Sequence, residues 1–177
     1  MTRSQSGRDD EPGRVESLER LVRRIGGSGP RSGTAVHLYL DVSGSVESFL
    51  GPLYAAVRGV ARFVCPVVHL FSADVVDVPI VDLAKRSCPT TGGTSIVPVA
   101  RHIRARGVRR AVIVTDGEVG PIGAMERETL GETILGVALT SRRERGGELA
   151  GLARHVVVLA GVERRAPAGE AEGEIRR

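Results

Sequence analysis

Short runs of apolar residues, separated by segments with helical spacing, are the feature that most limits the fold of this chain. Strand-like runs occupy residues 36–40, 67–71, 75–80, 110–114, 133–139 and 156–159. Most of these runs are apolar at consecutive positions, which is typical of strands covered on both faces. Helical spacing lies between them, for example at Leu53, Val57, Val60 and Val64. Strands that alternate with helices predict an α/β fold with a mostly parallel sheet.

One connection is too short for a helical crossover. Only residues 72–74 separate the second apolar run from the third, so residues 75–80 should return as the antiparallel strand of a hairpin. Helices are expected from Pro52 to the residue before Pro66, and over 96–106, 125–130 and 145–153. Thr94 or Ser95 is expected to cap the second of these helices, with Pro98 in its first turn.

The length of 177 residues fits one domain with ragged ends. We expect the domain at 34–163 and a flexible tail at 164–177. Residues 1–33 should comprise a disordered start, a short amphipathic helix and a Gly-rich linker. The helix, at 15–25, carries an apolar stripe of Leu18, Leu21, Val22 and Ile25. Docking of this stripe on the domain is the preferred interpretation, and binding of a partner is the alternative.

Composition argues against several classes of protein. Apolar residues make up 41% of the chain, but aromatic residues only 3%, so aliphatic side chains must fill the core. The net charge of +4 comes almost entirely from scattered arginines, without interleaved aromatic residues, which makes a nucleic-acid surface unlikely. No signal peptide or membrane span is apparent, so a cytoplasmic location is expected. Cys65 and Cys88 lack metal-ligand spacing and are interpreted as free thiols.

Three loops carry oxygen ligands. Asp41, Ser43 and Ser45 directly follow the first apolar run, and two further loops follow at 91–95 and 114–117. Asp41 and Asp116 both stand at the carboxyl ends of predicted strands, which is where ligands bind in open α/β sheets. Hydroxyl and carboxylate oxygens suit a hard cation such as Mg²⁺. The three loops therefore predict one shared cation site.

These motifs, taken in order, resemble the metal-ion-dependent adhesion site of von Willebrand factor A domains. The resemblance covers residues 34–161 and is greatest to intracellular bacterial members of the family. It implies a doubly wound, Rossmann-like sheet of strand order 3-2-1-4-5-6, with strand 3 antiparallel and helices on both faces. It also implies Mg²⁺, or Mn²⁺, held by hydroxyls and, partly through water, by carboxylates. The implied ligands are Asp41, Ser43, Ser45, Thr94 and Asp116.

The resemblance implies protein binding rather than catalysis. An open position on the cation would capture an acidic side chain of a partner protein, beside the residues Gly44, Gly93, Ser95, Gly117 and Glu118. Ser95 stands where many bacterial relatives have Asp. Glu118 is interpreted as a loop charge, with a competing ligand as the alternative.

Other functions remain open at this point. One alternative is a regulatory or substrate-presenting subunit of an AAA+ ATPase or another enzyme complex. A metal-dependent phosphoesterase is less favoured, because such an enzyme needs a second acid where Ser43 stands. Nucleotide-binding glycine motifs are missing, and the histidines show no metal-ligand spacing. His37, His69 and His155 lie in or beside strands and are interpreted as structural.

Overall fold

Six strands form one sheet in the computed structural model, which describes residues 18–27, 35–85, 93–140 and 147–159. The strands are β1 (Val36–Asp41), β2 (Val64–Phe71), β3 (Val75–Pro79), β4 (Arg110–Thr115), β5 (Ile134–Leu139) and β6 (His155–Val158). Their order is β3-β2-β1-β4-β5-β6, and only β3 pairs antiparallel. The predicted α/β class, strand order and β2–β3 hairpin are therefore confirmed.

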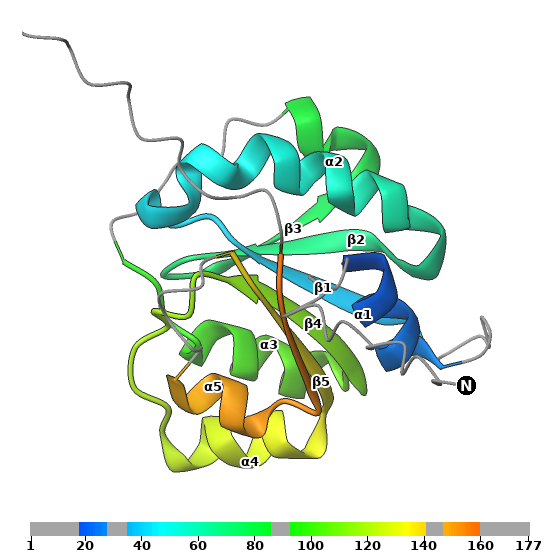
Figure 1. Ribbon diagram of the computed structural model, residues 1–177. Helices are drawn as coiled ribbons and strands as arrows, with labels where there is room; N and C mark the ends of the chain where they lie inside the picture. Colours follow the sequence, from blue (N-terminus) through cyan, green and yellow to red (C-terminus); the bar gives the residue numbers. More distant parts are fainter. Residues whose placement is uncertain (1–17, 28–34, 86–92, 141–146, 160–177) are drawn as a thin grey trace, which may run out of the picture.

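Helices cover both faces of this sheet (Figure 1). They are α1 (Leu18–Gly26), α2 (Leu50–Val60), α3 (Val97–Arg106), α4 (Ala124–Glu132) and α5 (Gly147–Leu152). Short 3₁₀ turns occupy Gly44–Phe49, Ala61–Phe63 and Ile80–Lys85. The first two helices pack on one face and the last three on the other. The described helices fall short of a bilayer span in length and apolar character.

The side-chain alternation of the central strands divides the core into two layers. In β1, Leu38 and Leu40 join the layer under α1 and α2, whereas Tyr39 joins the layer under α3. All three side chains are fully buried, as expected for a strand with helices on both sides. Because α2 and α3 lie on opposite faces, the direction of winding reverses between β1 and β4. This reversal places the carboxyl ends of β1 and β4 at the crevice where open α/β sheets bind ligands.

The N-terminal apolar stripe docks on the sheet, which confirms the preferred interpretation. All four of its side chains are buried in the same core layer as α2. The fit is close at Gly136 of β5, because a Cβ atom there would lie 2.9 Å from Cγ1 of Ile25. Arg110 of β4 also donates a hydrogen bond to the carbonyl oxygen of Gly26. Helix α1 is therefore packed against the strands of the domain.

Two local predictions are wrong. Helix α2 ends at Val60, so Val64 is the first residue of β2, and Pro66 lies within that strand instead of ending the helix. The register of β2 against β1 shifts in this region, which is where a sheet tolerates proline. The N-cap of α3 is Ile96, which offers no capping side chain. Ser95 nevertheless accepts a hydrogen bond from the backbone N–H of Val97 through its Oγ, at 3.3 Å.

Several sequence-based expectations lie outside the described residues. They are the disordered start, most of the Gly-rich linker, Cys88, the first part of the glycine loop and the C-terminal tail.

Candidate functional site

Asp41 ends β1 and is fully buried. Its Oδ1 atom accepts a hydrogen bond from the backbone N–H of Ser43 at 2.9 Å. Its Oδ2 atom accepts one from the hydroxyl of Thr115 at 2.8 Å. The Asp41 carboxylate is thus held by its own loop and by the end of β4, so its position is determined by the sheet.

Thr115 is the contact that sequence reasoning missed. Its Oγ1 donates to Asp41 and accepts a hydrogen bond from the backbone N–H of Gly117 at 3.1 Å. The strand register contains the signal, because Leu40 pairs with Val114, so the next residues, Asp41 and Thr115, come together. Thr115 therefore joins the two strands whose carboxyl ends form the predicted site.

The predicted hydroxyl ligands also come together. The Oγ atoms of Ser43 and Ser45 lie 3.1 Å apart, and the Thr94 hydroxyl lies 3.4 Å from Oδ1 of Asp41. The segment that contains Thr94 is tied to the neighbouring loops. Its backbone N–H groups at Ser95 and Ile96 donate to the carbonyl oxygens of Ser72 and Val119, respectively.

Asp116 adds a second carboxylate to this region. Its Oδ1 accepts a hydrogen bond from the backbone N–H of Glu118 at 3.0 Å, and only 9% of the residue is exposed. Burial raises the pKa of Asp41, hydrogen bonds from Ser43 and Thr115 lower it, and the negative charge of Asp116 raises it again. The negative charge of Asp116 thus lies close enough to Asp41 to oppose ionisation of the Asp41 carboxyl.

The residues predicted to flank a partner lie in the same loops. Gly44, Gly93 and Glu118 are exposed, whereas Ser95 and Gly117 are partly buried. Gly117 has a φ of 102°, a backbone conformation that favours glycine. These positions leave the rim of the oxygen-rich loops open to solvent at three residues. We call Asp41, Ser43, Ser45, Thr94 and Asp116 in these loops the oxygen site.

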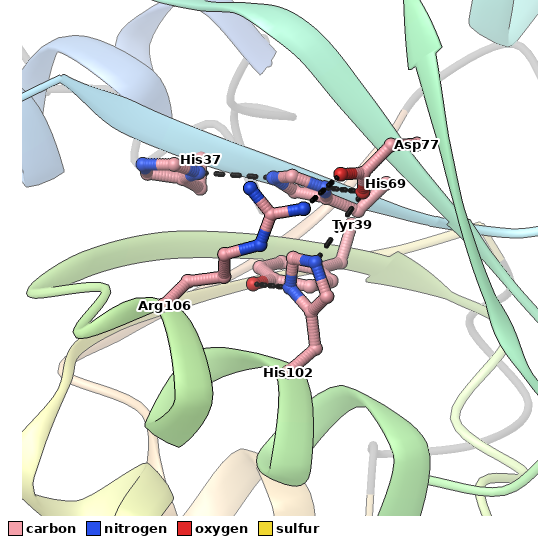
Figure 2. Close-up of polar contacts among 6 residues, drawn as sticks. All are labelled: His37, Tyr39, His69, Asp77, His102 and Arg106. Carbon is pink, nitrogen blue, oxygen red and sulfur yellow. Dashed lines mark hydrogen bonds and ion pairs between the residues drawn. The ribbon is translucent and has the colours of Figure 1, made fainter.

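A second polar cluster lies between the sheet and α3 (Figure 2). Nδ1 of His69 on β2 lies 2.7 Å from Oδ1 of Asp77 on β3. Nε2 of His102 on α3 lies 3.3 Å from the same oxygen. These three ligand atoms all lie within 4.8 Å of one another, so the group could hold a metal ion. We call His69, Asp77 and His102 the His-Asp-His group.

Three further residues surround this group. Nδ1 of His37 lies 2.9 Å from Nε2 of His69, and the Tyr39 hydroxyl lies 2.9 Å from Nδ1 of His102. Arg106 donates a hydrogen bond to Oδ2 of Asp77 at 2.8 Å. Burial is the largest cause that lowers the pKa of His69, to about 4, and it also lowers the pKa values of His37 and His102. The three imidazoles are consequently neutral at pH 7.

The prediction that the histidines show no metal-ligand arrangement holds only along the sequence. In the sheet, Tyr39 pairs with His69, and His69 pairs with Asp77 across the hairpin. His102 and Arg106 are four residues apart and share one face of α3, turned toward these strands. The pairing register of the strands, together with the face of α3 that is turned toward them, brings these residues together. Spacing along the sequence alone does not provide this information.

Comparison with known proteins adds no family assignment. No family model matches the chain, and no curated protein sequence matches it.

Proposed function

We propose that the oxygen site holds a divalent cation, Mg²⁺ or Mn²⁺, and that the chain is a von Willebrand factor A-like domain which binds an acidic side chain of a partner protein. The observation that carries the proposal is the convergence on Asp41 of three loops that are distant in sequence. A carboxylate, three hydroxyls and a second nearby carboxylate form an all-oxygen donor set of the kind that Mg²⁺ prefers. The proposed ligands are Asp41, Ser43, Ser45, Thr94 and Asp116.

The surroundings of Asp41 support this assignment. A buried carboxylate with a second carboxylate nearby is unfavourable unless positive charge or hydrogen bonds compensate it. The hydrogen bonds from Ser43 and Thr115 compensate part of this cost and also fix the direction of the carboxylate. A bound divalent cation would supply the remaining charge and an open position for a partner carboxylate.

The rim supports protein binding rather than catalysis. Gly44 and Gly93 carry no side chain that would block the approach of a partner, and both are exposed. Ser43 stands where a phosphoesterase of this general design would need an acid, and it hydrogen-bonds Ser45 instead. Ser43 therefore cannot supply the second acid that such an enzyme uses, which favours a ligand-binding role for the site.

Metal binding is the first test. If the cation binds the folded state alone, Mg²⁺ at a hundredfold excess over Kd should stabilise the protein by about 2.7 kcal/mol and raise its Tm. Asp41→Asn, which keeps an acceptor oxygen but removes the charge, should abolish this rise. Glu47→Gln removes an exposed carboxylate from the neighbouring 3₁₀ turn and should leave it unchanged. A Tm that responds to neither Mg²⁺ nor Mn²⁺ would contradict the proposal.

Partner capture is the second part of the same test. Full-length protein immobilised on beads should retain a partner from native lysate with Mg²⁺ and release it in chelator. The Asp41→Asn variant should not capture that partner, whereas Glu47→Gln should. Capture that survives both the chelator and the Asp41→Asn change would argue for a binding surface elsewhere.

A further inference from the structure

The His-Asp-His group differs from the oxygen site in donor chemistry and in place. It offers two imidazole nitrogens and one carboxylate oxygen, and it lies at the β3 edge of the sheet. Imidazole ligands suit zinc and other first-row transition ions, whereas Mg²⁺ prefers oxygen ligands. We propose that His69, Asp77 and His102 form a second metal site, for Zn²⁺ or a divalent ion of similar preference, which is independent of the oxygen site.

The spacing of the three ligand atoms supports this proposal. Tetrahedral zinc with bonds of about 2.0–2.2 Å keeps its ligand atoms roughly 3.3–3.5 Å apart. Nε2 of His102 already lies 3.3 Å from Oδ1 of Asp77. Nδ1 of His69 lies 2.7 Å from that oxygen, so these two atoms must separate by roughly 0.6–0.8 Å. Rotation of side chains can accommodate this movement.

Each proposed ligand has an outer partner. His37 faces the second nitrogen of His69, Tyr39 faces the second nitrogen of His102, and Arg106 binds the second oxygen of Asp77. In metal sites such outer contacts orient the ligands and select the tautomer that presents a lone pair to the ion. Figure 2 shows the rings and the carboxylate gathered between the strands and α3, with these outer partners around them.

One atom of the group is incompletely satisfied. Nε2 of His102 is buried and makes no hydrogen bond to the part of the chain that the structure describes. Its distance of 3.3 Å from Oδ1 of Asp77 is within ion-pair range but is longer than a usual N–H···O hydrogen bond. Buried polar atoms generally have partners, so an unsatisfied nitrogen that faces a carboxylate and another imidazole points to a missing ligand.

Exposure agrees with metal binding. The Asp77 side chain is 33% exposed, which gives an ion access and leaves room for a water ligand. Arg106 opposes a cation by its charge, and this repulsion limits the affinity. A bound ion would connect β2, the edge strand β3 and α3.

Co²⁺ titration followed by visible absorption tests the proposal, because tetrahedral Co²⁺ absorbs more strongly than the hydrated ion. The full chain would carry Cys65→Ser and Cys88→Ser, so that thiols do not contribute, and excess Mg²⁺ would saturate the oxygen site. One equivalent of Co²⁺ should bind, and Zn²⁺ should displace it. His102→Ala should weaken binding by at least about a hundredfold, and Tyr39→Phe by about tenfold to a hundredfold.

Matched controls separate this site from the other one. His155→Ala removes a histidine of β6 outside the cluster and should leave Co²⁺ binding unchanged, as should Asp41→Asn. If saturable Co²⁺ binding is absent, or is the same in the His102→Ala variant, the group is a hydrogen-bond network without metal. Asp41→Asn affects only the oxygen site. A negative result of the Co²⁺ titration is therefore distinguishable from a failure of the proposed function.

Discussion

Thr115 is the residue on which the geometry of the oxygen site depends most directly. Its hydroxyl is the only described side-chain donor from β4 to the buried Asp41 carboxylate, and the residue itself is fully buried. A buried carboxylate oxygen that loses its donor retains the cost of desolvation without compensation. Thr115 thus affects both stability and the direction in which Asp41 faces the proposed cation.

Replacement of Thr115 by valine should therefore destabilise the protein by about 1–3 kcal/mol at neutral pH. Val has almost the same shape as Thr, so the loss reports the hydroxyl rather than packing. Chemical denaturation measures the free energy of unfolding, and Thr115→Ser, which keeps the hydroxyl, is the control. A Thr115→Val variant as stable as the unchanged protein would show that the hydrogen bond contributes little.

Single residues differ in how far their roles could be predicted. Asp41, Ser43 and Ser45 form a local motif, so the chain itself brings them near one another. The role of Thr115 depends on the register between β1 and β4, and the His-Asp-His group depends on three elements at once. Spacing along a sequence does not contain this information, because it is set by how strands and helices pack.

At the level of elements, the contact between α1 and β5 is close. A Cβ atom on Gly136 would meet side-chain atoms of Ile25 at 2.9 Å and of Leu21 at 3.0 Å. Such distances require α1 or its side chains to move. The glycine in β5 is therefore what allows α1 to approach the sheet.

We expect Gly136→Ala to destabilise the protein by about 1–3 kcal/mol, the usual range for added volume in a packed core. Thermal unfolding measures the change. Gly131→Ala is the matched control, because a Cβ atom at that position of α4 meets nothing within 4 Å. This control should be neutral or slightly stabilising, since alanine favours helix. If both variants melt alike, α1 adapts to the added methyl group without cost.

The strands were predicted more accurately than the limits of α2. A buried strand is a compact apolar run, so its centre is evident from composition. The expected helix extended too far because Val64 continues the helical spacing of Leu53, Val57 and Val60. Sheet pairing decides whether Val64 belongs to the helix or to the strand, since Val64 pairs with Val36 of β1. Tertiary pairing thus overrides the local helical spacing of these residues.

For the molecule as a whole, the buried imidazoles predict how stability depends on pH. His69 has an ordinary pKa of 6.5, and burial lowers it to about 4 in the folded protein. Below pH 6.5 the unfolded chain takes up a proton that folded His69 resists, so stability falls as the pH is lowered from 6.5 toward 4. The groups that act on the pKa of His69 are His37 on β1, Asp77 on β3 and His102 on α3, and Arg106 of α3 in turn binds Asp77.

The expected loss from His69 is about 3 kcal/mol across this range, at about 1.4 kcal/mol per pKa unit. His37 and His102 should add to it, because burial also lowers their pKa values. Asp41, whose pKa burial raises, acts in the opposite direction on acidification. Urea denaturation in chelator at a series of pH values measures the slope, and His69→Gln should flatten it. A stability that stays constant from pH 7 to pH 5 would be inconsistent with a neutral buried His69.

The position of α1 has a consequence for how the chain folds. This helix comes first along the described chain, yet it packs against β4 and β5, which come late. Part of its apolar stripe therefore stays uncovered until those strands have been synthesised and paired. Contacts between such distant segments slow folding, and the exposed stripe makes the unfinished chain prone to aggregation. An apolar helix that waits for later strands is accordingly a segment of the nascent chain to which a chaperone can bind.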